Sequence, residues 1–89
     1  GKEVGPGTDA QSDDELNEYI RSKADTAYHP CGTCKMGVDD MAVVDENLKV
    51  KGIQNLRVID ASVIPEIPSA NLNAPVLMIA EKGADAILS

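Results

Sequence analysis

The stretch GIQNLRVIDASVIP, at residues 52–65, holds the clearest strand pattern of the sequence. Within it, Leu56–Asp60 is rich in β-branched residues and ends on a carboxylate, which is typical of a strand. Shorter strands are expected upstream, at Ala42–Asp45 and Leu48–Val50. Asp60 has two interpretations. It is either a carboxylate at a strand's carboxyl end, where α/β proteins bind ligands, or an acceptor that caps a turn.

A helix is expected before these strands, over Asp13–Ala24. Ser12 precedes it in a capping box with Glu15. The Ser12 hydroxyl can accept a hydrogen bond from the Glu15 amide, and the Glu15 carboxylate can reach back to the Ser12 amide. Acidic residues in the first turn suit the positive end of the helix dipole. Apolar residues then follow at helical spacing, so the helix is expected to have one narrow apolar face.

A second helix is expected from Ala74 to the end of the sequence. Asn73 is its predicted N-cap, and Pro75 lies in the first turn, where no amide partner is needed. Val76–Ala80 is apolar on all sides, which predicts that this part of the helix is buried. Gly83 lowers helix stability by roughly 1 kcal/mol relative to Ala. We therefore expect another backbone to pack closely against Gly83.

The remaining segments carry many turn-forming residues and are expected to be irregular. Residues 1–11 are interpreted as a loop or ragged start, 28–37 as a structured loop entered by a short strand at Ala27–His29, and 61–73 as a long irregular stretch. The sequence thus predicts an α/β fragment, α+β in its arrangement, with an N-terminal helix, short strands, long loops and a C-terminal helix. Residues 12–89 are expected to form one structural segment.

Composition restricts the class of protein. A chain of 89 residues allows one domain at most. Its 15 acidic residues outnumber its 8 basic residues, which argues against electrostatic binding to nucleic acid or to an anionic membrane. No apolar run approaches the ~20 residues of a membrane span, and no signal peptide is visible. We expect a cytoplasmic location, with peripheral membrane association left open.

His29, Cys31 and Cys34 are the soft metal ligands of the sequence, and they lie within six residues of one another. A zinc site commonly has four protein ligands, and the chain has no other His or Cys. A disulfide across two residues would constrain little, so free thiols that pack in a loop are the simpler interpretation. A small metal-binding or thiol-redox module remains the alternative. His29 is either a solvated loop residue or, because imidazole titrates near neutral pH, a proton-transfer group.

Three segments of the sequence resemble, in order and spacing, segments of one enzyme family. They are YHPCGTCKMG at 28–37, GIQNLRVIDASVIP at 52–65 and NLNAPV at 71–76, and AEKGADAI at 80–87 resembles the family's last helix. The family is that of the glucose-methanol-choline (GMC) flavoprotein oxidoreductases. Their polypeptides are several times longer, and their amino-terminal G-x-G-x-x-G fingerprint is absent here. The resemblance implies a C-terminal segment, belonging to the FAD-binding and substrate domains.

The resemblance also implies an activity. Family members use FAD to oxidise an alcohol to a carbonyl by hydride transfer to flavin N5, and the Cys34-Lys35-Met36 version is most similar to choline-type alcohol dehydrogenases of the family. A primary, choline-like alcohol is therefore the expected substrate. His29 aligns with the residue that accepts the hydroxyl proton. Asn71 aligns with its partner, and because an amide cannot take that proton, Asn71 is expected to orient the substrate oxygen.

The cofactor residues follow from the same resemblance. Asp60 and Ala61 match the stretch that approaches the FAD pyrophosphate and ribityl chain, and Asn73, Ala74 and Pro75 match the turn that faces the flavin pyrimidine edge. No metal is expected. The expected partners are the alcohol substrate and the rest of the parent polypeptide. The segment alone is expected to be inactive, and its apolar last helix could make it self-associate.

Overall fold

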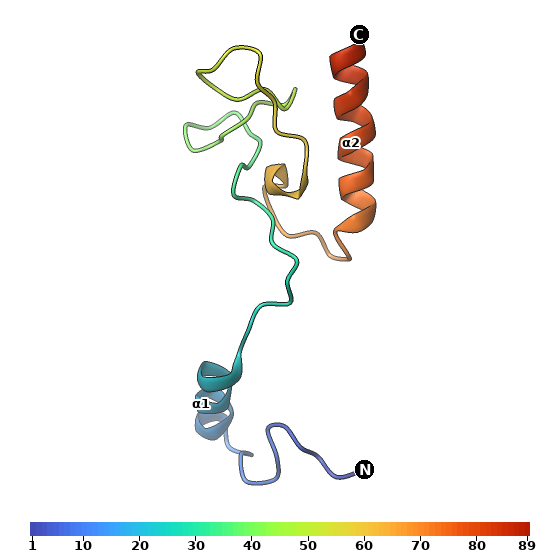
Figure 1. The fold of residues 1–89 in the computed structure, drawn as a ribbon. Helices are drawn as coiled ribbons and strands as arrows, with labels where there is room; N and C mark the ends of the chain where they lie inside the picture. Colours follow the sequence, from blue (N-terminus) through green and yellow to red (C-terminus); the bar gives the residue numbers. More distant parts are fainter.

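The computed structural model describes all residues, 1–89, and divides them into two parts (Figure 1). A small N-terminal part contains one helix, α1, and a larger C-terminal body contains a 3-10 turn, η1, and a second helix, α2. An extended linker joins them. The radius of gyration is 19.3 Å, whereas a compact chain of this length would have about 12 Å. The chain is therefore elongated, with most of its packing confined to the C-terminal body.

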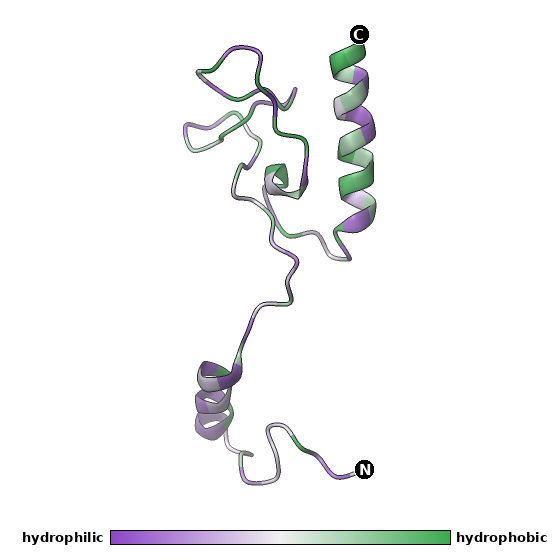
Figure 2. Cartoon of the chain, viewed as in Figure 1, coloured by the Kyte–Doolittle hydropathy of each residue, from purple (hydrophilic) through white to green (hydrophobic).

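Helix α1 spans Asp13–Lys23, one residue short of the predicted end. Its N-cap is Ser12, whose Oγ accepts from the Glu15 amide at 3.2 Å, as predicted. The Glu15 carboxylate binds the Ser12 hydroxyl at 2.7 Å rather than the Ser12 amide, so the second half of the predicted capping box is wrong. The helix buries no residue, and Figure 2 shows that most of its length is coloured as hydrophilic.

Helix α2 spans Asn73–Leu88, with Pro75 in its first turn as predicted. The predicted N-cap is wrong: Asn73 is the first helical residue, and Leu72 precedes it in a helical conformation without any side-chain cap. Leu72 packs against the hydrophobic core, and its carbonyl accepts from the Val76 amide at 2.9 Å. The helix thus begins where an apolar residue anchors the chain, rather than at a polar cap.

The predicted strands are wrong as regular elements. In their place are isolated bridges: a parallel one between Met36 and Val44, and antiparallel ones between Val44 and Val50 and between Lys49 and Arg57. No strand forms at 27–29 either. The predicted segments therefore lie beside one another, but each pair meets at one position only.

Left-handed residues explain why no longer ladder forms. Leu48 has φ 64°, Asn55 has φ 60° and Gly52 has φ 81°. Each left-handed residue redirects the chain, so no segment stays extended long enough to pair continuously with its neighbour. Of the expected α/β architecture, the chain therefore contains the two helices and the long loops. Isolated bridges between loops replace the expected strands.

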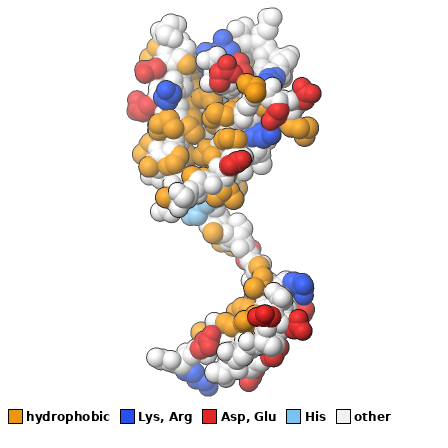
Figure 3. All heavy atoms as spheres, turned by 180° about the vertical axis from the view of Figure 1, so that it is seen from behind, with side chains coloured by type: hydrophobic (Ala, Val, Ile, Leu, Met, Phe, Trp, Pro, Cys, Tyr) orange, Lys and Arg blue, Asp and Glu red, His pale blue; other side chains and the backbone are white.

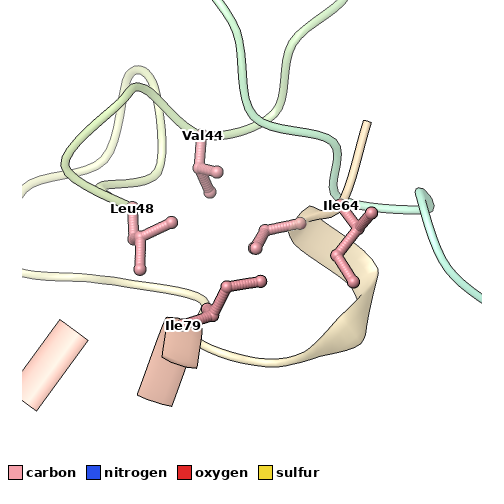
Figure 4. Packing of buried hydrophobic residues seen from close by; sticks show 5 residues of the cluster. Val44, Leu48, Ile64 and Ile79 are labelled. Carbon is pink, nitrogen blue, oxygen red and sulfur yellow. The ribbon is translucent and has the colours of Figure 1, made fainter. Parts of the chain in front are cut away.

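The hydrophobic core lies in the C-terminal body, between α2 and the loops. Figure 4 shows its side chains converging from separate segments of the chain; the cluster comprises Val44, Leu48, Val63, Ile64 and Ile79. Val44 and Val63 are fully buried, and only 7 of the 89 residues are buried in total. A core this small leaves much apolar surface outside it.

Helix α2 is less buried than its sequence predicts. Of Val76–Ala80, only Ile79 is buried, while Leu77 and Met78 are 59% and 53% exposed. The prediction of a helix start buried on all sides is therefore wrong for this chain. Apolar side chains gather on the surface over the body (Figure 3), and the total accessible area is 7167 Å². A compact protein of this mass would expose about 5,000 Å².

Gly83 is buried in α2, but the expected neighbouring backbone is absent. A Cβ placed on Gly83 would instead lie 2.6 Å from Cγ2 of Ile59. The close approach is confirmed, and its partner is a side chain. Neither helix is long and apolar enough to cross a membrane.

Candidate active site

The loop that carries His29 is fixed against η1, which spans Ala61–Val63. The amides of Cys34 and Met36 donate to the carbonyls of Ser62 and Val63, both at 2.9 Å. Gly32, with φ +90°, lies against the next carbonyl, that of Ile64, where a Cβ would be 3.3 Å away. The first two of the three recognised sequence segments are therefore joined through their backbones.

The third segment packs onto the same core. Leu72 and Val76, at the start of α2, contact the cluster that Cys31 and Ala61 also contact. Residues from 28–37, 52–65 and 71–76 thus pack on one hydrophobic cluster, which includes Val63 and Ile64. This packing brings the segments of all the predicted site residues into one body.

His29 lies in the exposed part of this loop, and its ring makes no hydrogen bond within the chain. The chain's one histidine appears in pale blue on the surface in Figure 3. Tyr28, immediately before it, has φ 61°, a conformation that costs a non-glycine residue about 1–3 kcal/mol. The Tyr28 amide donates to Thr26 Oγ1 at 3.0 Å, which supports this turn. Local backbone geometry therefore fixes how the chain enters His29.

Asp60 is the N-cap of η1, which confirms one of its two interpretations. Its Oδ1 accepts from the Ser62 amide at 2.8 Å and from the Ser62 hydroxyl. These hydrogen bonds hold the pKa of Asp60 below its ordinary value of 3.8. The carboxylate is consequently ionised at neutral pH and fixes the turn that leads from Ile59 into Ala61.

The start of α2 presents unpaired donors. The backbone amides of Asn73 and Ala74 have no hydrogen-bond partner within the chain, and Pro75 has no amide hydrogen. Asn71, Asn73 and Ala74 are all exposed. Free amides at a helix N-terminus, together with the helix dipole, suit an anionic or electron-rich group.

Neither cysteine is in a disulfide, and both are half-buried. Cys31 packs against the hydrophobic core, as expected of a loop-packing residue. No three His, Cys, Asp or Glu side chains lie close enough together to hold a metal ion. The structure therefore gives the alternative of a metal-binding module no donor set.

The two main grooves of the body contain no predicted site residue. One, of about 420 Å³, lies between α2 and residues 46–48, and the other, of about 1060 Å³, follows residues 49–57. His29, Asp60 and Asn71 lie outside both. The predicted site is therefore neither of these two grooves.

Sequence reasoning missed two residues of this region. One is Tyr28, whose left-handed backbone has no signal in its residue type. The other is Arg57, whose Nη1 donates to the Asn47 carbonyl at 2.6 Å and whose Nη2 donates to the Ala86 carbonyl at 3.4 Å. The sequence did contain a signal for Arg57, which is a charged residue within the apolar stretch Leu56–Ile59. A half-buried guanidinium group must find polar partners.

Comparison with known proteins identifies the family. Residues 1–80 match the sequence model described as GMC oxidoreductase. The chain belongs to the GMC oxidoreductase family. The oxygen-dependent choline dehydrogenase of Klebsiella pneumoniae (strain 342) is 59% identical over 87 residues, covering 98% of this chain and 16% of that protein. The corresponding enzyme of Chromohalobacter salexigens is 56% identical over 87 residues, with the same coverage. The chain thus spans about 16% of the length of these relatives.

A solved structure of a longer protein agrees with the elongated shape. The crystal structure of pyridoxine 4-oxidase from Mesorbium loti matches with a TM-score of 0.81 and 45% sequence identity, covering 92% of this chain and 16% of that one. A match over so much of the chain includes both α1 and the C-terminal body. The separation of the two parts is therefore a property that this chain shares with a much longer protein of known structure.

Proposed function

We propose that this chain is the C-terminal part of an FAD-dependent enzyme that oxidises a primary, choline-like alcohol to an aldehyde. The observation that carries the proposal is the meeting of segments 28–37, 52–65 and 71–76 on one core. The 59% identity to an oxygen-dependent choline dehydrogenase supports the choice of substrate class. FAD, when bound, supplies the acceptor for the hydride at its N5 position.

His29 is the proposed base. Hydride leaves the alcohol carbon only as negative charge develops on the oxygen, so removal of the hydroxyl proton favours the reaction. The His29 ring is exposed and has no partner in this chain, so both of its nitrogens are free to face a substrate. The turn at Tyr28 limits the directions from which the ring can approach.

Asn71 is proposed to hold the same oxygen. Its amide can donate a hydrogen bond to an alcohol or alkoxide but cannot accept the proton at neutral pH. It is exposed and immediately precedes the anchored Leu72, so its backbone is tied to the core that also holds the loop of His29. The proposed roles therefore differ: the imidazole of His29 accepts the proton, and the amide of Asn71 donates a hydrogen bond.

The residues present fit a partial FAD cradle. The unpaired amides of Asn73 and Ala74 can donate to the flavin pyrimidine edge, where the reduced ring carries negative charge. Pro75 and the backbone of Asp60 and Ala61 are proposed to complete this chain's contribution. The rest of the cradle, and the cover for exposed apolar residues such as Leu77, would come from the remainder of a longer polypeptide.

The test uses a full-length polypeptide that carries this segment, and the 89-residue chain alone as its control. We expect the full-length protein to bind FAD and to convert choline to its aldehyde with reduction of an artificial electron acceptor, and the chain alone to do neither. Alcohol oxidation by the isolated chain, or none by the FAD-loaded full-length protein with any primary alcohol, would contradict the proposal. Stoichiometric zinc without flavin would favour the metal-binding alternative instead.

A further inference from the structure

Gly83 of α2 lies close against the side chain of Ile59. A Cβ on Gly83 would lie 2.6 Å from Cγ2 and 2.8 Å from Cδ1 of Ile59. Cγ2 is bonded directly to Cβ of a β-branched residue, whose χ1 is stiff, so it cannot swing aside as a flexible side-chain end would. Helix α2 therefore cannot carry a side chain at position 83 unless it moves relative to Ile59.

A second contact fixes the same two segments. Arg57 Nη2 donates to the carbonyl of Ala86 at 3.4 Å, about one turn of α2 beyond Gly83. Its Nη1 donates to the carbonyl of Asn47 at 2.6 Å. Residues 57–59 are thus held against the C-terminal half of α2 at two points.

These contacts lie within the path of packed elements that joins the two proposed catalytic residues. From Ile59 the chain runs directly into the Asp60 cap and η1, which holds the loop of His29. In the other direction, Gly83 lies ten positions after Asn73 in α2, about 15 Å along the helix, and Asn71 lies just before the helix begins. The register of α2 against Ile59 therefore helps to set where Asn71 lies relative to His29.

We propose that Gly83 is a positioning residue for the active site: its missing side chain lets Ile59 seat against α2 and so aligns Asn71 with the loop of His29. This inference rests on the proposed function of that pair. Moving from 2.6 Å to an ordinary contact of about 3.6 Å requires a shift of about 1 Å. A 1 Å misplacement of catalytic groups can lower a rate by about 10²-fold.

The experiment compares Gly83→Ala, Ile59→Ala and the double variant in the full-length protein, with Lys82→Ala as an exposed control on the same helix. Three quantities are measured: flavin content, the rate of flavin reduction by choline per bound flavin, and the melting temperature of the flavin-free protein. We expect Gly83→Ala to lower the reduction rate per flavin at least tenfold and to lower the melting temperature. The double variant, in which Ile59 no longer reaches the new methyl group, should recover most of both losses, and Lys82→Ala should change neither.

The rate per bound flavin separates positioning from a merely structural role, which would lower flavin content and melting temperature but not the chemistry of the loaded fraction. A wild-type rate in Gly83→Ala would overturn the proposal. So would a double variant that is no better than Gly83→Ala, including one that fails to fold. If wild type reduces no flavin with any alcohol, the proposed function fails and the positioning role falls with it, although recovery of the melting temperature would still establish the steric contact.

Discussion

The amide of Met36 donates to the carbonyl of Val63 at 2.9 Å, which ties the loop of His29 to the 3-10 turn that follows Asp60. Val63 is also fully buried, so the residue that holds the loop is itself held by the core. Backbone pairing and apolar packing therefore act at the same position. Changes to the core at Val63 should reach the loop of His29.

Replacement of Val63 by Ala tests this coupling. The substitution removes two buried methyl groups and leaves a cavity, so we expect the free energy of unfolding of the full-length protein to fall by about 2 kcal/mol. Urea unfolding measures this loss. Val38→Ala is the matched control, because Val38 is 90% exposed in this chain, so the same change there removes no contact with the core and should cost less. Equal losses in the two variants would show that burial at Val63 does not stabilise the fold.

Asp60 should make the turn at η1 sensitive to acid. Its pKa is lowered because the ionised carboxylate accepts hydrogen bonds from the hydroxyl and amide of Ser62. A carboxyl whose pKa is lower in the folded state stabilises the fold fully above its unfolded pKa of about 3.9 and loses this effect as pH falls through the folded pKa. We expect the Ser62 amide resonance to move only below about pH 4.

The Asp60→Asn variant is the control for that titration. Asparagine can still accept from the Ser62 amide but does not ionise, so the acid-dependent movement of the Ser62 resonance should disappear. NMR titration of both proteins measures the difference. A resonance that moves equally in both would mean that another group causes the acid response.

The left-handed backbone of Tyr28 should matter more than its side chain. Tyr28 is 76% exposed and has φ 61°. Asparagine tolerates this conformation, whereas β-branched valine does not. We therefore expect Tyr28→Asn to keep the rate of flavin reduction within a few fold of wild type. Tyr28→Val should lower that rate by about tenfold, because a β-branched residue is more strained at positive φ than tyrosine and would turn the loop away. Equal rates in the two variants would assign any effect to the lost phenol ring.

Local sequence signals predicted both helices, but they did not predict how the strand-like segments pair. Ser12 and Glu15 cap α1 through contacts within one turn, so the sequence contains the whole interaction. The segments 42–45, 48–50 and 56–60 have strand-like composition, but left-handed residues such as Leu48 interrupt their pairing. Composition reports what a segment favours, while the length of a ladder depends on turns and partners far along the chain.

The burial of the start of α2 and the assembly of the proposed site also depend on contacts that local sequence patterns do not contain. The apolar character of Leu77 and Met78 is plain in the sequence, but burial depends on a partner surface that this chain does not contain. The identities of His29 and Asn71 came from family resemblance. The hydrogen bonds from Cys34 and Met36 to η1, which bring their segments together, are long-range and had no sequence signal.

The most direct test of the proposed site is a single-turnover measurement of flavin reduction in the full-length protein. Anaerobic stopped-flow mixing with choline would compare wild type with His29→Ala and Asn71→Ala, with flavin content measured in each. The proposal predicts that His29→Ala, at full flavin occupancy, reduces its flavin at least ~10²-fold more slowly, because the hydroxyl proton has lost its acceptor. A His29→Ala variant that binds flavin and reduces it at the wild-type rate would contradict the assignment.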